Sequence, residues 1–251
     1  MCTIVLLRRP GHDWPLILGA NRDEMASRPS KAPARHWPDR SEVVAGLDVE
    51  AGGSWLGLND AGVTAAILNR HGTLGRAKGF RSRGELVLEA LDHADAVEAA
   101  RALKHIEPGA YRPFNMVIAD NRDAFWLRHA DPTGTLGLTV TPIPEGVSML
   151  TAGELDDPEV GRIRRHRPLF AKAKAPNPDR NDFTAWQALL ESRETAPEDG
   201  PTGAMRFETE TGFGTVSSAI IAMSQPGHGE HRWRFRFATW SPKPEPWRDV
   251  S

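Results

Sequence analysis

Two short apolar runs close to the N-terminus restrict the fold most strongly, because both are apolar almost throughout and not only at alternate positions. They span Thr3–Arg8 and Leu16–Ala20, and a turn rich in proline, glycine and aspartate separates them. Runs of this length around such a turn predict a β-hairpin. Since neither face of these strands is polar, we expect both faces of the sheet to be covered by other layers.

The rest of the chain alternates between strand-like and helix-like stretches without a repeating strand–helix–strand unit. Helical spacing and capping patterns predict two helices within 82–105, with a break near His93, and further helices over Pro158–Lys174 and through 188–190. Strands are predicted at Val43–Asp48, Gly53–Leu58, Val63–Asn69, Phe114–Ala119, Ala124–His129, Gly137–Thr141, Val147–Thr151, Ser217–Met223 and Arg232–Thr239.

The connections complete this prediction. Gly137–Thr141 and Val147–Thr151 are expected to pair with each other, and 28–38 and 194–214 are expected to be surface loops. The proline-rich tail after Ser241 is expected not to continue a strand. The order of elements indicates an α+β fold with mostly antiparallel sheet and outer helices, and 1–251 is expected to be one domain.

The composition excludes several classes of protein. Apolar residues make up 39% and charged residues 25% of the 251 residues, as in a soluble globular protein, and the net charge of −2 gives no basic surface for nucleic acid. One cysteine can form neither an internal disulfide nor a cysteine-rich zinc site. No targeting segment or membrane span is predicted, so the expected location is cytoplasmic. No particular oligomeric state is indicated.

The single cysteine, Cys2, follows the initiator methionine directly. A small second residue generally permits removal of Met1, after which Cys2 would carry a thiol and a free α-amine. With a pKa of roughly 8, that amine is partly uncharged near neutral pH and can serve as a base. A nucleophile that uses the N-terminal amine as its base is a known catalytic arrangement. The alternative is that a cysteine at this position is incidental.

The sequence around Cys2 resembles a known family. Met1-Cys2-Thr3, Asn21-Arg22-Asp23-Glu24 and 52–57 (Gly-Gly-Ser-Trp-Leu-Gly) are similar to the NRDE family, also called the transport and Golgi organisation protein 2 family. That family is similar to the N-terminal nucleophile hydrolases, whose fold is a four-layer αββα sandwich. The resemblance implies that Cys2 is a nucleophile that cleaves the carbon–nitrogen amide bond of a small acyl substrate without a cofactor.

The resemblance also implies roles for other residues. Arg22 is expected to supply positive charge near the thiol, and Asp23 to hold and orient the α-amine. Asn69 matches an asparagine that donates to the oxyanion. Asn21 and Trp55 are expected to contact substrate. The alternative for each is a structural role: a strand end for Arg22, Asp23 and Asn69, a turn for Asn21, and packing for Trp55.

Two departures from the related hydrolases favour a second function. Ala152 stands where many relatives have an asparagine, and Val216 where they tend to have an arginine. The alternative function is therefore a non-catalytic carrier of a hydrophobic ligand such as haem or acyl-CoA, in which Cys2 could ligate haem iron. The basic cluster 162–167 is expected to be a solvated helix face, and His228 and His231 to lie in a solvated loop with no metal site.

Overall fold

The computed structural model describes residues 2–75, 77–229 and 232–251, which form two compact units. The terminal unit consists of Met1–Arg28 and Pro144–Ser251, and the central unit of Pro29–Ile143. Each unit has its own sheet and its own buried cluster of apolar side chains. Helices and antiparallel sheet are thus mixed as the α+β prediction requires, whereas the prediction of a single domain stays a prediction.

The terminal unit is built on a sheet of six strands in which all neighbours are antiparallel. The predicted N-terminal hairpin is confirmed, with Thr3 opposite Asn21 and Arg8 opposite Leu16. In spatial order the strands are β10 (Gly146–Leu150), β1 (Thr3–Arg8), β2 (Leu16–Met25), β11 (Phe213–Met223), β12 (Trp233–Thr239) and β13 (Glu245–Asp249).

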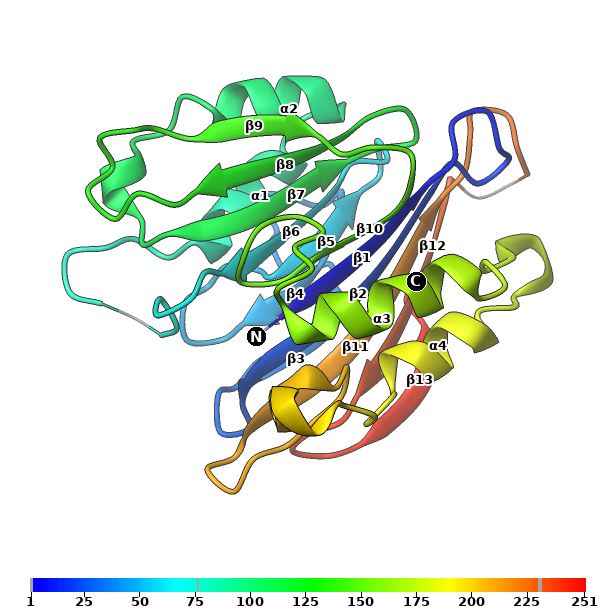
Figure 1. Ribbon diagram of the computed structural model, residues 1–251. Helices are drawn as coiled ribbons and strands as arrows, with labels where there is room; N and C mark the ends of the chain where they lie inside the picture. The colour runs from blue at the N-terminus through cyan, green and yellow to red at the C-terminus, as the bar shows by residue number, and fades with distance from the viewer. Residues whose placement is uncertain (1, 76, 230–231) are drawn as a thin grey trace. The chain divides into compact units, whose positions relative to one another are not determined.

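Helices α3 (Gly161–Lys172) and α4 (Thr184–Leu190) cover one face of this sheet (Figure 1). Val5 and Ile17 pack on Phe170 and Trp186 from these helices, and a side chain at Gly19 would lie 3.3 Å from the Trp186 ring. Because side chains alternate along a strand, odd-numbered residues of β1 and β2 face the helices. Even-numbered residues such as Leu18 face the opposite side and are also buried. The helix layer on one face of the hairpin is confirmed, and a layer on the other face stays a prediction.

The central unit contains an antiparallel sheet of seven strands, with helices α1 (Gly84–Leu91) and α2 (Ala96–Leu103) packed on its apolar core. The predicted break between the helices is confirmed, and the Asn59 side-chain amide donates to the carbonyls of Leu91 and His93 there. The strands follow chain order: β3 (Ser30–Ala34), β4 (Val43–Asp48), β5 (Leu56–Asn59), β6 (Thr64–Asn69), β7 (Phe114–Ala119), β8 (Ala124–His129) and β9 (Thr139–Pro142).

The glycines around Trp55 are required by close packing within the central unit. A side chain at Gly53 would come within 2.4 Å of the backbone carbon of Gly84, and one at Gly46 within 2.4 Å of the Trp55 ring. Trp55 therefore fills the space above a residue that has no side chain. The glycine-rich motif is explained by local packing in which Ser54 N–H also donates to the Gly84 carbonyl at 3.0 Å.

Four expectations about the connections were wrong. The loop predicted over 28–38 contains β3, and the tail forms β13, in which Arg248 pairs with Phe237 of β12. Both are edge strands, where a proline removes no required ladder bond, so Pro33 and Pro246 are tolerated. The predicted pairing of 137–141 with 147–151 is replaced by β9 pairing with β8 and β10 with β1. In 194–214, expected at the surface, Met205 and Phe207 are buried.

Candidate functional site

Cys2 directly precedes β1, between two neighbouring strands of the terminal unit. Continuing the β1–β2 register by one residue places Cys2 opposite Arg22, and continuing the β1–β10 register by two residues places it opposite Ala152. Side-chain alternation puts Cys2 and Arg22 on the face of the sheet opposite α3 and α4. The sequence prediction that Arg22 lies beside the thiol agrees with this register.

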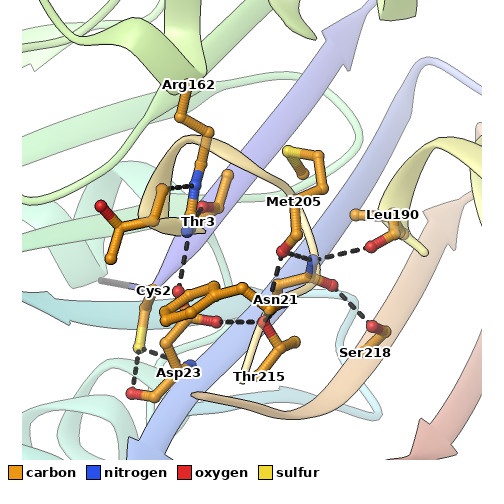
Figure 2. Close-up of polar contacts among 11 residues, drawn as sticks. Cys2, Thr3, Asn21, Asp23, Arg162, Leu190, Met205, Thr215 and Ser218 are labelled. Atoms are coloured by element: carbon orange, nitrogen blue, oxygen red, sulfur yellow. Dashed lines mark hydrogen bonds and ion pairs between the residues drawn. The ribbon is translucent and has the colours of Figure 1, made fainter. Parts of the chain in front are cut away.

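The thiol of Cys2 contacts the backbone of Asp23 both as a hydrogen-bond donor and as a hydrogen-bond acceptor. Sγ lies 3.6 Å from the Asp23 carbonyl oxygen, to which the thiol donates, and 3.4 Å from the Asp23 nitrogen, whose N–H donates to sulfur. Figure 2 shows Sγ directed toward Asp23. These two contacts fix the sulfur at the point where β1 begins and β2 passes it.

The surroundings of this thiol disfavour its thiolate form. Burial, and next the negative charge of Asp23, raise the pKa of Cys2, while the hydrogen bond from the Asp23 backbone and the charge of Arg22 act in the opposite direction. A thiol with a raised pKa reacts slowly unless a neighbouring group removes its proton. Nucleophilic use of Cys2 therefore requires a base close to sulfur.

The carboxylate of Asp23 is buried and held from two sides on the helix-covered face. The Arg162 guanidinium donates to Oδ2 at 2.9 Å, and the Thr215 hydroxyl donates to Oδ1 at 2.8 Å (Figure 2). The side chains of Arg162 and Asp23 are 1% and 0% exposed, so their charges meet almost out of contact with water. An ionised carboxylate can accept about four hydrogen bonds, so Asp23 is able to bind more groups than these two donors.

Arg162 has several further partners in the terminal unit. It donates to the Thr3 hydroxyl at 2.7 Å and to the Thr202 carbonyl at 3.0 Å, and its guanidinium lies 5.3 Å from the centre of the Phe207 ring. The expected solvated helix face was wrong for Arg162 and for His166, both of which are buried. The spacing of four and eight residues from Arg162 to His166 and to the apolar Phe170 was the sequence signal that places it on the buried side.

Asn21 lies inside β2 and not in a turn. The nitrogen and the oxygen of its side-chain amide both form hydrogen bonds. Nδ2 donates to the carbonyls of Leu190 at 2.9 Å and Met205 at 2.7 Å, and Oδ1 accepts from the Ser218 hydroxyl at 2.6 Å. Both N–H donors are thus used to fasten α4 and the following segment to the sheet. This geometry favours the structural role, and contact with substrate stays a prediction.

The two departures from related hydrolases lie next to Cys2 and Asp23. Ala152 is 2% exposed and offers no side-chain hydrogen-bond donor opposite Cys2. Val216 is the bulged residue where the pairing of β11 with β2 shifts, between Thr215 opposite Asp23 and Ser217 opposite Arg22. A β-bulge redirects neighbouring side chains, and here Thr215 bonds the Asp23 carboxylate.

The structure brings together three predicted residues, Cys2, Arg22 and Asp23, within the terminal unit. Asn69 and Trp55 belong to the central unit. Asn69 ends β6 opposite Phe114 of β7, and Trp55 packs over Gly46. The oxyanion role of Asn69 and the substrate contact of Trp55 stay predictions.

Neither a metal-binding cluster nor a membrane-spanning helix is found in the described part of the chain. Within 2–75, 77–229 and 232–251, no group of three histidine, cysteine or acidic side chains is arranged to hold a metal ion, and His231 lies outside the described residues. His228 bonds Asp179 through Nε2 at 3.0 Å. Among the helices of the described chain, none has the length and apolar character needed to span a bilayer.

Solved structures with the same fold are amide hydrolases. The N-acylethanolamine-hydrolyzing acid amidase orthologue of Caenorhabditis elegans is 14% identical, with a TM-score of 0.58 over 92% of this chain and 97% of its own. Penicillin V acylase from Agrobacterium tumefaciens is 13% identical, with a TM-score of 0.57 over 100% of this chain and 86% of its own. At these identities the likeness shows the fold, which is that of the N-terminal nucleophile hydrolases.

Curated relatives match the sequence more closely over a shorter length. The human Transport and Golgi organization protein 2 homolog is 41% identical over 114 residues, and the mouse protein is 40% identical over 112 residues. Each match covers 43% of this chain and 39% of the relative's length. The profile described as Transport and Golgi organisation 2 matches residues 1–231, and the chain therefore belongs to that family.

Proposed function

We propose that this protein is an N-terminal-cysteine amidohydrolase that cleaves the carbon–nitrogen bond of a small acyl-amide after removal of Met1. The observation that carries the proposal is the joint placement of Cys2 and Asp23. The backbone of Asp23 contacts Sγ, while the carboxylate of the same residue is held by Arg162 and Thr215. The hydrolase fold supports a reaction of this class.

The proposal assigns a base to the protonated thiol. Loss of Met1 would leave an α-amine on the residue that carries the sulfur, and this amine would take the thiol proton. Its charged form would be stabilised by the nearby carboxylate of Asp23, which Arg162 holds in place. The raised pKa of the Cys2 thiol explains why such a base is needed.

The reaction then proceeds in two steps. Sγ attacks the carbonyl carbon, a carbon–sulfur bond forms, and the proton moves from sulfur through the α-amine to the departing nitrogen as the carbon–nitrogen bond breaks. In the second step the amine deprotonates water, which attacks the thioester and releases the carboxylic acid and the free thiol. Arg22, on the same face as Cys2, would stabilise the thiolate as it forms.

Two finer expectations belong to the same proposal. The sheets would stack as the four-layer αββα sandwich of this fold, and the Asn69 amide would donate to the oxyanion. Because Ala152 offers no side-chain donor opposite Cys2, the reaction would depend strongly on any remaining donor. Asn69→Ala should then lower kcat by about 10²–10³, the usual cost of one oxyanion donor.

Penicillin V and an N-acylethanolamine are suitable probes, since they are the substrates named for two proteins of this fold. Hydrolysis of either by the wild type, and its loss in Cys2→Ala, would support the proposal. A variant with Ser inserted between Met1 and Cys2 serves as the control, because it keeps the thiol and removes its α-amine. Equal activity of this variant would contradict the role of the amine.

Ala152 also favours the second candidate, a carrier of haem or acyl-CoA, since a carrier needs no oxyanion donor. A thiolate can ligate haem iron, and Cys2 as a residue is half-buried. Haem titration of the wild type and of Cys2→Ala separates the cases. Identical spectra would exclude ligation by the cysteine, and the absence of binding by both haem and acyl-CoA would exclude the carrier.

A further inference from the structure

A pocket in the terminal unit, away from the thiol of Cys2, is lined by two arginines. Its empty volume, open to solvent, is about 300 Å³. Arg193 and Arg206 line it together with Phe207, Trp240 and Ser241, and Thr215 is also among the lining residues. The Thr215 hydroxyl points instead to the Asp23 carboxylate, so the pocket adjoins the Cys2 site without including the sulfur.

Arg206 is held rigidly in this pocket by an aromatic ring. The centre of its guanidinium lies 3.9 Å from the centre of the Trp240 ring, and Trp240 is fixed because its Nε1–H donates to the Ser218 hydroxyl at 2.7 Å. Trp247 packs edge-on against the same ring at 6.2 Å. A guanidinium whose face is covered by a ring keeps its N–H groups free to bind a ligand at its edge.

Neither arginine is satisfied by a protein hydrogen bond. In 2–75, 77–229 and 232–251, no hydrogen bond from the Arg193 or Arg206 side chain is found, although the Arg206 side chain is only 20% exposed. The Glu191 carboxylate is 4.0 Å away and accepts from Trp247 at 2.7 Å instead. Burial and then the charge of Arg193 lower the pKa of Arg206, while the charges of Glu191 and Glu208 act in the opposite direction.

We propose that this pocket is a binding site for a phosphate group, held by the edges of Arg193 and Arg206. A phosphate has several acceptor oxygens and close to two negative charges at neutral pH, which suits two guanidiniums with unused donors. Glu208 also lines the pocket and opposes the anion. Binding here is independent of the reaction at Cys2, and the ligand is either inorganic phosphate or a small phosphomonoester.

Calorimetric titration with inorganic phosphate and with glycerol phosphate, at constant ionic strength, tests the site. The experiment uses the full chain with Cys2→Ala, so that its result does not depend on hydrolysis. We expect saturable binding, at least tenfold weaker in Arg206→Gln and Arg193→Gln and tighter in Glu208→Gln. Arg101→Gln, which removes an exposed arginine paired with Glu98, is the matched control and should bind as the parent does.

The two phosphate compounds distinguish the source of the ligand, because tighter binding of the ester would assign the site to an organic phosphate. Arg193 is exposed, so its variant should fold normally even where Arg206→Gln is destabilised. Absence of saturable binding, or equal binding in Arg193→Gln, would overturn the proposal. Equal affinity for acetate would overturn the assignment to phosphate.

Discussion

The buried pair of Arg162 and Asp23 gives the sharpest prediction about the site, since its strength follows from its geometry. At 2.9 Å the gross attraction is about 6 kcal/mol with an effective dielectric constant of 20, and desolvation of both groups offsets much of it. Arg162→Met removes the cation and leaves the carboxylate of Asp23 buried. Breaking such a pair on one side costs ~3–5 kcal/mol of unfolding free energy.

The assay is urea unfolding of a double-mutant cycle. Arg162→Met combined with Asp23→Asn removes both charges, so the double variant should be more stable than the sum of the single changes predicts, by at least ~2 kcal/mol. Arg164→Met is the matched control on the same helix, because Arg164 is 47% exposed and pairs with Asp199 at 3.0 Å. Surface pairs contribute about 0–1 kcal/mol.

Two results would refute this reasoning. If Arg162→Met costs no more than Arg164→Met, the buried pair does not hold the carboxylate in place. The double variant could instead lose as much unfolding free energy as the two single variants together. In that case Arg162 and Asp23 act independently, and the role of Arg162 in orienting Asp23 is wrong.

Three other predictions concern stability, measured by urea unfolding. Asn21→Ala leaves two carbonyls without their donor and should cost about 2–4 kcal/mol; a loss below 1 kcal/mol would contradict the bracing role. Gly53→Ala should cost about 1–3 kcal/mol, because its Cβ would meet the Gly84 backbone at 2.4 Å; unchanged stability would exclude this contact. Burial, then the charges of Arg162 and Arg165, lower the pKa of His166 from 6.5 to about 4, so the unfolded chain binds its proton first as pH falls. Stability should therefore drop by ~2 kcal/mol between pH 7 and pH 5, and His166→Phe should remove that drop.

The sequence alone predicted the elements whose hydrophobic pattern is strong. Strands β1, β7 and β8 begin and end where the pattern indicated, whereas β2 begins at the predicted Leu16 but continues past the predicted end, Ala20, to Met25. β13 was missed because proline content argued against a strand, and an edge strand does not need every N–H. The pairing of β10 with β1 joins residues 138 to 146 positions apart, a contact that local turn signals cannot reveal.

The candidate site was predictable to a similar extent. The motif Asn21–Glu24 and Cys2 were recognised together, and β2 presents their side chains on alternate faces. Arg22 shares the face of Cys2, whereas Asn21 and Asp23 face the helices. Arg162 was not predicted because it lies 139 residues from Asp23 in a helix rich in arginine, where a solvated charge was the reasonable expectation.

The central claim is that Cys2 becomes the N-terminal residue and forms the acyl intermediate. Intact-mass measurement with peptide mapping tests it most directly, on the purified protein before and after rapid quenching with penicillin V. We predict a chain that lacks Met1 and a transient phenoxyacetyl adduct on Cys2, absent from the Cys2→Ala variant. A mature chain that retains Met1 would contradict the account, as would turnover of penicillin V with no adduct on Cys2.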